Sequence, residues 1–336
     1  MDYVGIAEEI DRQMLVNLTG RIGVTGMYAA AREKLGIPLT LHAAQLLMEK
    51  MNEDSVVFIA TGWADIHPSM AESDGPPGAA SLARALSVAF RAVPIILVED
   101  ELIRSMKATM LAAGLFPLPP DEVLEAHEIG QKTGARYVCS VIDFPKDTQQ
   151  AKKASEELIK KFSPSAVITV EKGGMNEKGV FHNSRGFATG KYISKIDYLI
   201  DEGKRRGIPT VGIGDGGNEI GMGVIGEWIK KEIPYGAKCR CPCGSGIAPY
   251  NKTDSLIVAP ISNWGAYGLE AAIALLLKRP EIMHDGAIEL RVLGQAANAG
   301  FIMARWGYTD PGADGLSDKY HSYVVELLRR IVLASI

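Results

Sequence analysis

The chain has 336 residues, a formal net charge of −4, and 47% hydrophobic and 23% charged side chains. This length is enough for one large α/β domain or two smaller ones. The sequence has no basic block that could neutralise phosphates, which argues against a nucleic-acid-binding protein. Its longest apolar stretches, such as 271–277, fall well short of the roughly 20 residues that span a bilayer.

The start of the chain gives no sign of a targeting segment. Asp2, Glu8 and Glu9 occur within the first ten residues, and the basic start of a signal peptide is missing. The Arg-rich, acid-poor composition of a transit peptide is missing too. We therefore expect a cytoplasmic protein with no nucleic-acid or membrane partner.

The first part of the chain is predicted to be helical. Apolar residues recur at helical spacing in 4–18, and two more helices are predicted at 24–35 and 38–51. We interpret 1–54 as a helical segment that packs on the main domain, 55–336.

From residue 55 onward, short β-branched apolar runs alternate with helical patterns. The runs are 55–60, 93–98, 137–142, 166–170, 210–213 and 255–259. The helices between them are predicted near 78–90, 100–113, 121–133, 147–162, 189–206, 219–232 and 264–278. Such apolar strands need helices on both faces of a sheet, and the alternation implies right-handed βαβ units. The expected fold class is therefore three-layer α/β, with a mostly parallel, doubly wound sheet.

In a sheet of this kind ligands bind beyond the carboxyl ends of the strands, so the residues after each run are candidates for a site. Thr61 follows the first run, and an acidic loop after it ends in Asp74-Gly75-Pro76-Pro77-Gly78. Glu171 and Lys172 follow the fourth run. Asn263 follows the sixth, just before a predicted helix.

The glycine-rich segment 212–223 is the strongest candidate, with six glycines in twelve residues. Glycine lets backbone N–H groups approach a ligand, and such a loop at a helix start can bind an anion. A literal G-x-G-x-x-G occurs at 212–217, but the acid expected about 20 residues later falls on Glu232, inside a predicted helix. Asp215 would also repel a pyrophosphate. We favour a functional site over a tight turn with Asp215 as the helix cap.

Three cysteines, Cys239, Cys241 and Cys243, lie in a six-residue stretch that could bind a soft metal. Their spacing lacks the C-x-x-C pairs of structural zinc sites, and no second Cys/His cluster follows. The sequence therefore favours redox-sensitive or plain surface thiols over a metal site. His182 and Arg185 could bind a carboxylate, although such side chains in loops are usually solvated.

Several of these motifs occur together in a known family. Thr61-Gly62, DGPPGAA at 74–80, Glu171 with its glycines, GDGGNEIGMG at 214–223 and SNWGAYGL at 262–269 resemble the signatures of the D-glutamate cyclase-like C-terminal domain family. The resemblance implies an α/β domain. In vertebrate members this domain is the C-terminal part of a mitochondrial enzyme that converts D-glutamate to 5-oxo-D-proline and water. The chain lacks the N-terminal domain of those longer members, so any activity that depends on it is expected to be absent.

The resemblance implies a D-glutamate cyclase type of hydro-lyase that acts on a small carboxylate or amino-acid substrate. In this reaction the α-amine attacks the γ-carboxyl group. This reaction needs a base and an acid, for which we choose Asp215 and Glu219, with Glu171 in reserve. Backbone N–H groups could stabilise the oxyanion. The predicted substrate-binding residues are Thr61, Asp74, Lys172, Arg185, Gly214, Gly216, Gly217, Asn218, Gly221 and Asn263.

Several alternatives stay open at this stage. The carboxylates could hold Mg²⁺, although no cofactor is required by the sequence. The glycine-rich loop could instead serve a phosphate- or nucleotide-dependent enzyme, or the chain could be a non-catalytic amino-acid-binding module. The apolar side chains of the last helix, near 324–332, could close the core or form a homodimer interface.

Overall fold

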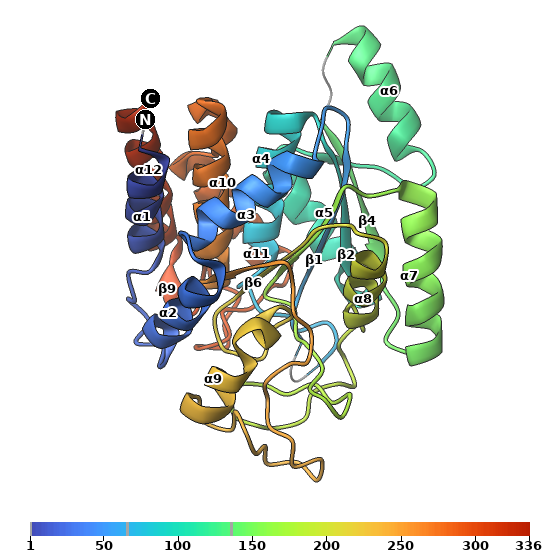
Figure 1. Ribbon diagram of the computed structural model, residues 1–336. Helices are drawn as coiled ribbons and strands as arrows, with labels where there is room; N and C mark the ends of the chain where they lie inside the picture. Colours follow the sequence, from blue (N-terminus) through green and yellow to red (C-terminus); the bar gives the residue numbers. More distant parts are fainter. Residues whose placement is uncertain (1, 65–66, 135–136) are drawn as a thin grey trace.

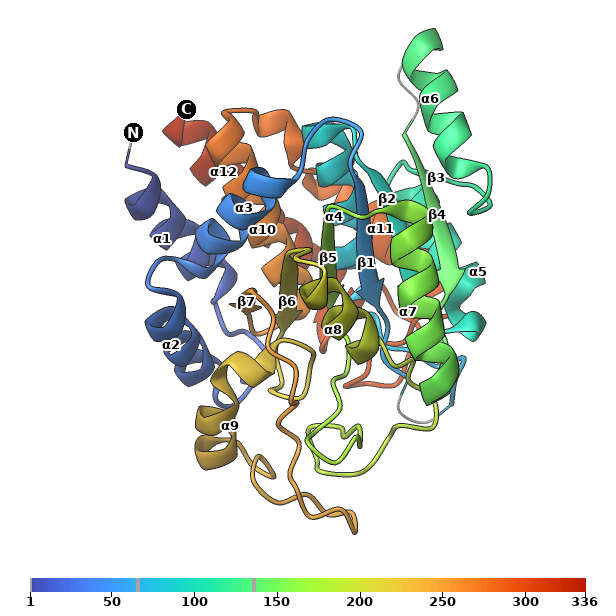
Figure 2. The ribbon, with the colours of Figure 1, turned by 45° about the vertical axis from the view of Figure 1, so that its right-hand side comes forward.

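The fold was analysed in a computed structural model that describes residues 2–64, 67–134 and 137–336. Its centre is a parallel sheet with strand order β3-β4-β2-β1-β5-β6-β7 (Figures 1 and 2). The strands are β1 (Val56–Thr61), β2 (Val93–Val98), β3 (Phe116–Pro117), β4 (Val138–Asp143), β5 (Ala166–Val170), β6 (Thr210–Gly214) and β7 (Ser255–Val258). A separate antiparallel pair consists of β8 (Gly312–Ala313) and β9 (Leu316–Ser317).

The α-helices follow the predicted alternation. They are α1 (Tyr3–Met14), α2 (Val24–Leu35), α3 (Leu39–Lys50), α4 (Pro76–Phe90), α5 (Ile103–Ala112), α6 (Val123–Thr133), α7 (Thr148–Phe162), α8 (Asp197–Arg205), α9 (Gly226–Glu232), α10 (Ser262–Leu277), α11 (Gly286–Asn298) and α12 (Asp318–Ser335). Short 3-10 turns are η1 (Asp100–Leu102), η2 (Met222–Ile225) and η3 (Pro280–Ile282). The three-layer α/β prediction is confirmed.

Alternate side chains of each strand enter two separate hydrophobic cores. In β1, Phe58 packs with Phe162 of α7 and with residues of α8, whereas Ile59 packs in the core that contains α4 and α10. Both faces of the sheet are covered in this way, and this is why the strands are apolar throughout.

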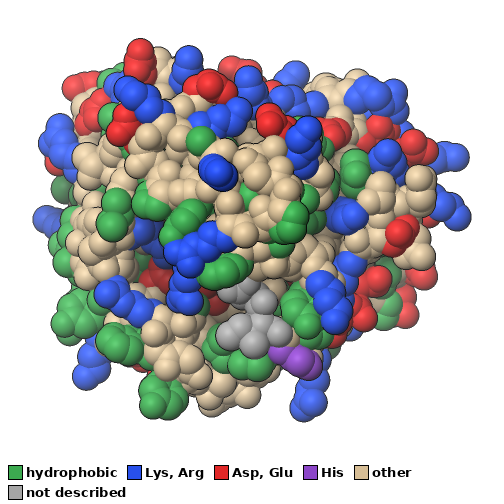
Figure 3. Space-filling view, turned by 90° about the horizontal axis from the view of Figure 1, so that it is seen from below, with side chains coloured by type: hydrophobic (Ala, Val, Ile, Leu, Met, Phe, Trp, Pro, Cys, Tyr) green, Lys and Arg blue, Asp and Glu red, His purple; other side chains and the backbone are tan. Residues whose placement is uncertain are grey.

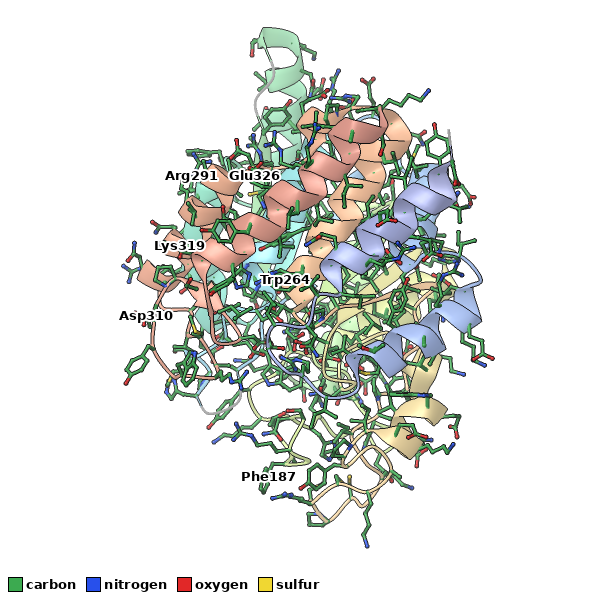
Figure 4. All side chains as sticks on the ribbon, turned by 90° about the vertical axis from the view of Figure 1, so that its left-hand side faces the viewer. Phe187, Trp264, Arg291, Asp310, Lys319 and Glu326 are labelled. Carbon is green, nitrogen blue, oxygen red and sulfur yellow. The ribbon has the colours of Figure 1, made fainter. Side chains whose placement is uncertain are left out.

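α10 is the central helix of one layer and is buried on almost every side, from Ser262 to Leu275. It packs against α4, α3, α1 and α12. A helix that is apolar all round requires such complete cover. Figure 4 shows Trp264, in the first turn of α10, in the interior near α12 and α1. Two of the three predicted helices of 1–54, α1 and α3, therefore serve as cover for α10, whereas α2 packs on β7 and η2. The division of the chain at residue 54 stays a prediction.

Two sequence predictions fail locally. A helix was predicted over 189–206, but α8 begins only at Asp197, because backbone N–H groups of the preceding residues bond elsewhere. Ser194 N donates to Glu99 Oε1 at 2.7 Å, and Lys195 N donates to the carbonyl of Pro145 at 3.0 Å. The helix predicted over 219–232 begins as the 3-10 turn η2 and becomes α-helical only at Gly226.

A buried charged group joins α10 to α11. His284 Nδ1 lies 2.7 Å from Glu270 Oε2, and its Nε2 lies 3.2 Å from Glu289 Oε2. Tyr267 donates its hydroxyl to Glu289 at 2.6 Å. Burial lowers the pKa of His284, but Glu270 and Glu289 outweigh that effect and raise the pKa to about 10. The imidazolium therefore balances carboxylates that would otherwise be unpaired in the core.

This arrangement predicts a loss of stability at alkaline pH. The folded state keeps a proton on His284 that the unfolded state releases above its ordinary pKa of 6.5. The stabilisation is therefore complete below about pH 6.5 and is lost as the pH rises through about 10. His284→Gln should lower the free energy of unfolding by about 3–5 kcal/mol at pH 7, measured by urea denaturation.

The control is His67→Gln, a change at an exposed histidine. This variant should keep both the stability and the alkaline pH dependence of the parent chain. If His284→Gln retains that pH dependence, the ion pairs of His284 with Glu270 and Glu289 are not the cause of the alkaline loss of stability.

Candidate active site

The carboxyl ends of β1 and β5 meet where the strand order changes direction. β1 pairs with β2 on one side and with β5 on the other, and Thr61 lies opposite Val170. In a doubly wound sheet this switch point opens a crevice for ligands. Gly75 lies in that crevice with φ of +101°, and a Cβ there would come within 2.8 Å of both Thr61 Oγ1 and Glu171 Cβ. A side chain at this position would therefore displace the strand ends.

Asp74 and Asn263 hold the helices α4 and α10 together at their N-termini. Asp74 accepts hydrogen bonds from the backbone N–H groups of Ser262 and Asn263, each at 2.8 Å. Asn263 Oδ1 in turn accepts from the N–H groups of Gly75 at 3.0 Å and Gly78 at 2.7 Å. Each helix start is thus satisfied by a side chain from the other. Both Asp74 and Asn263 were predicted to bind substrate. In the structure they cap these helices, and neither residue lines the cavity at this edge of the sheet.

A cavity of about 690 Å³ opens below the sheet at this edge. Figure 3 views this side of the molecule and shows acidic side chains inside a hollow, with Lys and Arg side chains around it. The volume suits a small molecule. The cavity is lined by Thr19, Gly20, Arg21, Ile22, Trp63, Met70, Glu72, Glu171, Asn183, Ser184, Arg185, Asp215, Asn218, Glu219, Ile302, Ala304, Arg305 and Asp314.

Arg21 is the cation nearest to the carboxylates of the cavity. It comes from the loop between α1 and α2, and its guanidinium lies 2.6 Å from Asp215 Oδ2. It also pairs with Asp314, from the turn between β8 and β9. Burial would lower the pKa of Arg21, but Asp215 and Asp314 outweigh that effect and raise it well above its ordinary value. The guanidinium therefore stays charged.

The carboxyl groups around Arg21 take up protons more readily than exposed ones. Burial, together with Glu219 and Asp74, raises the pKa of Glu171 well above its usual range. Burial also raises the pKa of Asp215 well above its usual range, although Arg21 opposes the shift. For Asp74, burial and then Asp314 raise the pKa to about 7. Because like charges this close cannot all ionise, these carboxyl groups keep their protons to a higher pH than exposed carboxyl groups do.

Backbone N–H groups of the loop after β6 donate hydrogen bonds to a side chain of the same loop. Gly216 N donates to Glu219 Oε1 at 2.7 Å, and the N–H groups of Gly217 and Asn218 donate to Glu219 Oε2 at 2.9 and 3.1 Å. These donors are therefore engaged by a side chain of the same loop. The anion cradle predicted for a ligand is thus occupied by the carboxyl group of Glu219, and binding of a ligand there stays a prediction.

The glycines of this loop serve close packing instead of lining the cavity. A Cβ on Gly214 would lie 2.9 Å from Glu219 Cβ, and one on Gly221 would lie 2.7 Å from Thr253 Oγ1. None of the four predicted glycine contacts belongs to the cavity lining; they are Gly214, Gly216, Gly217 and Gly221.

Lys172 is also placed differently from the prediction. Its amine donates to the carbonyl of Gly62 at 2.9 Å and to Glu99 Oε1 at 2.5 Å, and the side chain is fully buried. Lys172 therefore ties β5 to β1 and β2 and does not line the cavity. Thr61 is likewise buried at the strand end and outside the lining.

Glu171 has an unusual backbone conformation. Its φ is +46°, a region that residues other than glycine rarely adopt, and such strain is concentrated at functional sites. Its Oε2 accepts a hydrogen bond from Ser262 Oγ at 2.5 Å. Glu171 also lines the cavity, so the strained backbone lies at the candidate site.

The structure brings together five of the predicted site residues at the cavity, namely Glu171, Arg185, Asp215, Asn218 and Glu219. Sequence reasoning missed Arg21, Glu72, Arg305 and Asp314. Two of these lie beside glycines in short irregular segments, Gly20-Arg21-Ile22-Gly23 and Gly312-Ala313-Asp314-Gly315. That local pattern was the available signal.

Two overlapping sets of carboxylates could accept a hard cation. One set consists of Asp215, Glu171 and Glu219, and the other of Asp215, Asp74 and Asp314. Within each set the carboxyl oxygens that could bind the cation lie within 4.8 Å of one another. Such oxygen donors suit Mg²⁺. Because Arg21 already neutralises part of this charge, a cation at Asp215 would compete with the guanidinium.

The fold and the cavity define an α/β protein with a cluster of buried carboxyl groups, among them Glu171 and Asp215 with raised pKa values, at the switch point of its sheet. The model of the family "D-glutamate cyclase-like, C-terminal" matches residues 29–329, and the chain belongs to this family. The chain is also 27% identical, over 224 residues, to the human protein named D-glutamate cyclase, mitochondrial. That match covers 66% of this chain and 33% of the human protein, so the chain spans about a third of the relative's length.

Among the helices in the described part of the chain, none is long and apolar enough to cross a membrane.

The ion pairs of Arg21 can be tested through stability. Arg21→Gln should lower the free energy of unfolding by about 2 kcal/mol at pH 8, less than the 3–5 kcal/mol of a fully buried pair. The expected loss is smaller than for a fully buried pair because the Arg21 side chain is 26% exposed. At pH 5 the loss should be smaller, since carboxyl groups with raised pKa values are then protonated and need the cation less.

Urea denaturation at the two pH values measures both losses. The control is Arg305→Gln, because Arg305 lines the same cavity but donates to the carbonyl of Thr19. Equal losses for Arg21→Gln at both pH values would show that Arg21 acts through packing and not through its charge.

Proposed function

We propose that this chain catalyses the ring closure of D-glutamate to 5-oxo-D-proline with release of water. The observation that carries the proposal is the pair of carboxyl groups of Glu171 and Asp215, which lie within 4.8 Å of each other at the cavity and both have raised pKa values. Such a pair can offer an acid and a base at the same pH. Membership of the D-glutamate cyclase-like family supports this substrate.

The reaction requires proton transfers but no oxidant or reductant. A bond forms between the α-nitrogen and the γ-carbon, and one γ-carbon–oxygen bond breaks. The α-ammonium group loses two protons in total, and the departing oxygen gains two protons to leave as water. Acid–base groups that pass protons from the nitrogen to the oxygen therefore suffice. A cavity that holds the substrate folded removes much of the entropic barrier to ring closure.

Glu171 and Asp215 divide the two roles according to their surroundings. Arg21 lies against Asp215 and favours its ionised form, so Asp215 is the base that accepts a proton from the α-ammonium group. Glu171 is protonated and donates to the γ-carboxyl group, which neutralises the charge that resists attack. This assignment replaces the predicted pair Asp215 and Glu219, because the oxygens of Glu219 accept three loop N–H groups.

Other side chains of the cavity can orient the substrate. Asn218 Oδ1 is buried and has no hydrogen-bond partner among the described residues, so it can accept from the substrate ammonium group. Arg185 and Arg305 lie at the same cavity and can pair with the substrate carboxylates.

The direct test is incubation of the purified chain with D-glutamate and, separately, with L-glutamate. We expect 5-oxo-D-proline from the D-isomer, measured by chiral chromatography. Absence of product from a folded sample would contradict the proposal for this chain. The same assay is run with EDTA and with Mg²⁺. Turnover in EDTA assigns neutralisation of the γ-carboxyl group to the proton of Glu171, whereas turnover only with Mg²⁺ assigns it to a cation among the carboxylates.

Two substitutions test the assigned roles. Glu171→Gln and Asp215→Asn should each lower kcat by about 100-fold or more, the usual contribution of an acid or a base. The matched control is Asp197→Asn, because burial also raises the pKa of Asp197 to about 7 but its carboxyl group lies outside the cavity lining. Activity retained in Glu171→Gln or in Asp215→Asn would remove that residue from the mechanism.

A further inference from the structure

Two long segments below the sheet are built almost without helix or strand. They cover 171–196 and 233–254, and apart from isolated bridges they contain only turns and irregular backbone (Figures 1 and 2). Irregular segments of this length are uncommon in compact domains unless something fixes them. The first supplies part of the cavity wall, at Asn183, Ser184 and Arg185. Its fixation therefore matters for the site.

The two segments meet at a cluster of sulfur and nitrogen atoms. Cys239 Sγ lies 3.5 Å from Cys241 Sγ and 3.3 Å from Cys243 Sγ. His182 Nε2, from the other segment, lies 3.2 Å from Cys241 Sγ and 3.6 Å from Cys243 Sγ. The four donor atoms all lie within 4.8 Å of one another, and the remaining cysteine, Cys139, is buried in β4.

These separations match the edges of a tetrahedron around a metal ion. Zinc–sulfur bonds of about 2.3 Å and zinc–nitrogen bonds of about 2.0–2.1 Å place neighbouring ligand atoms roughly 3.5–3.8 Å apart. The observed edges of 3.2–3.6 Å are close to these values. A disulfide would join only two of the three sulfurs and would leave His182 unexplained.

The surroundings of the cluster resemble an outer shell of metal ligands. Asn176 is buried, and its Nδ2 donates to Cys243 Sγ at 3.4 Å and to the carbonyl of Gly246 at 2.8 Å. Its Oδ1 accepts from the N–H of Val180, two residues before His182. A donor to a ligand sulfur is one of the usual outer-shell contacts of such sites.

We propose that one zinc ion is bound in a closed tetrahedral site by four side chains, His182, Cys239, Cys241 and Cys243. Three thiolates and one imidazole form a donor set that selects zinc over hard cations such as Mg²⁺. Because the protein supplies all four ligands, no position is open for a substrate or water. The site is structural. The sequence expectation of plain or redox-sensitive thiols missed the fourth ligand, because His182 lies 57 residues before Cys239.

The zinc ion would fix one wall of the cavity. His182 directly precedes the wall residues 183–185, and its carbonyl accepts a hydrogen bond from Asn218 Nδ2 at 2.8 Å. A few other contacts join the two segments. Arg240 N donates to the carbonyl of Gly186 at 2.9 Å, and the Arg240 guanidinium lies 5.0 Å from the ring centre of Phe187, labelled near the lower end of Figure 4.

The test is elemental analysis of the untagged full chain, purified under reducing conditions with zinc in the growth medium. We expect about one zinc per chain, falling below about a tenth in Cys241→Ser and in His182→Asn. Cys139→Ala is the matched control and should keep the zinc. A metal content unchanged in Cys241→Ser and in His182→Asn would overturn the assignment.

A second measurement covers the case in which the variants fail to fold. The parent chain is stripped with a chelator and refilled with Co²⁺, and a thiolate-to-cobalt charge-transfer band with tetrahedral visible bands is expected. Stripping should also lower Tm. A metal-free folded chain that binds no Co²⁺, a disulfide mapped within the cluster, or iron with acid-labile sulfide would each refute the zinc site. None of these readouts depends on turnover, so they test the zinc site independently of the proposed reaction.

Discussion

The exchange of caps between Asp74 and Asn263 is the constraint on which the site depends. Two buried helices, α4 and α10, begin at the same crevice, and each leaves backbone N–H groups that need acceptors. The two side chains supply them reciprocally. This fixes the start of α10, and with it Ser262, whose hydroxyl holds the carboxyl group of Glu171. The family motifs DGPPG and SNWG thus contain the two side chains that cap these helices reciprocally.

The protein buries two charged clusters that differ in their balance. Around His284, one cation lies between two carboxylates in a closed part of the core, and each group has a partner. Around Arg21, one cation faces more carboxylates than it can neutralise, and the cluster borders a cavity. The first arrangement stabilises the fold. The second leaves carboxyl groups with raised pKa values at the edge of a cavity, an arrangement that costs stability and is typical of functional sites.

The sequence predicted the fold well because the decisive information is local. Six apolar runs identified six of the seven strands of the sheet, and β3 was missed because Phe116–Pro117 is too short to show a pattern. The site was harder to predict. Asp74 and Asn263 were recognised as special, but each caps a helix nearly 190 residues away, which no local pattern reveals. For Arg21 the flanking glycines gave a weak local signal, but its partners Asp215 and Asp314 lie far along the chain.

The ion pair between Arg21 and Asp314 also constrains the order in which parts of the protein fold. The two residues are 293 positions apart, so the contact closes almost the whole chain into one loop. During synthesis Arg21 emerges 293 residues before Asp314. The sheet from β1 to β7 can assemble before then, because its strands all precede Asp314. The site is therefore completed as a late event, after the scaffold that surrounds it has formed.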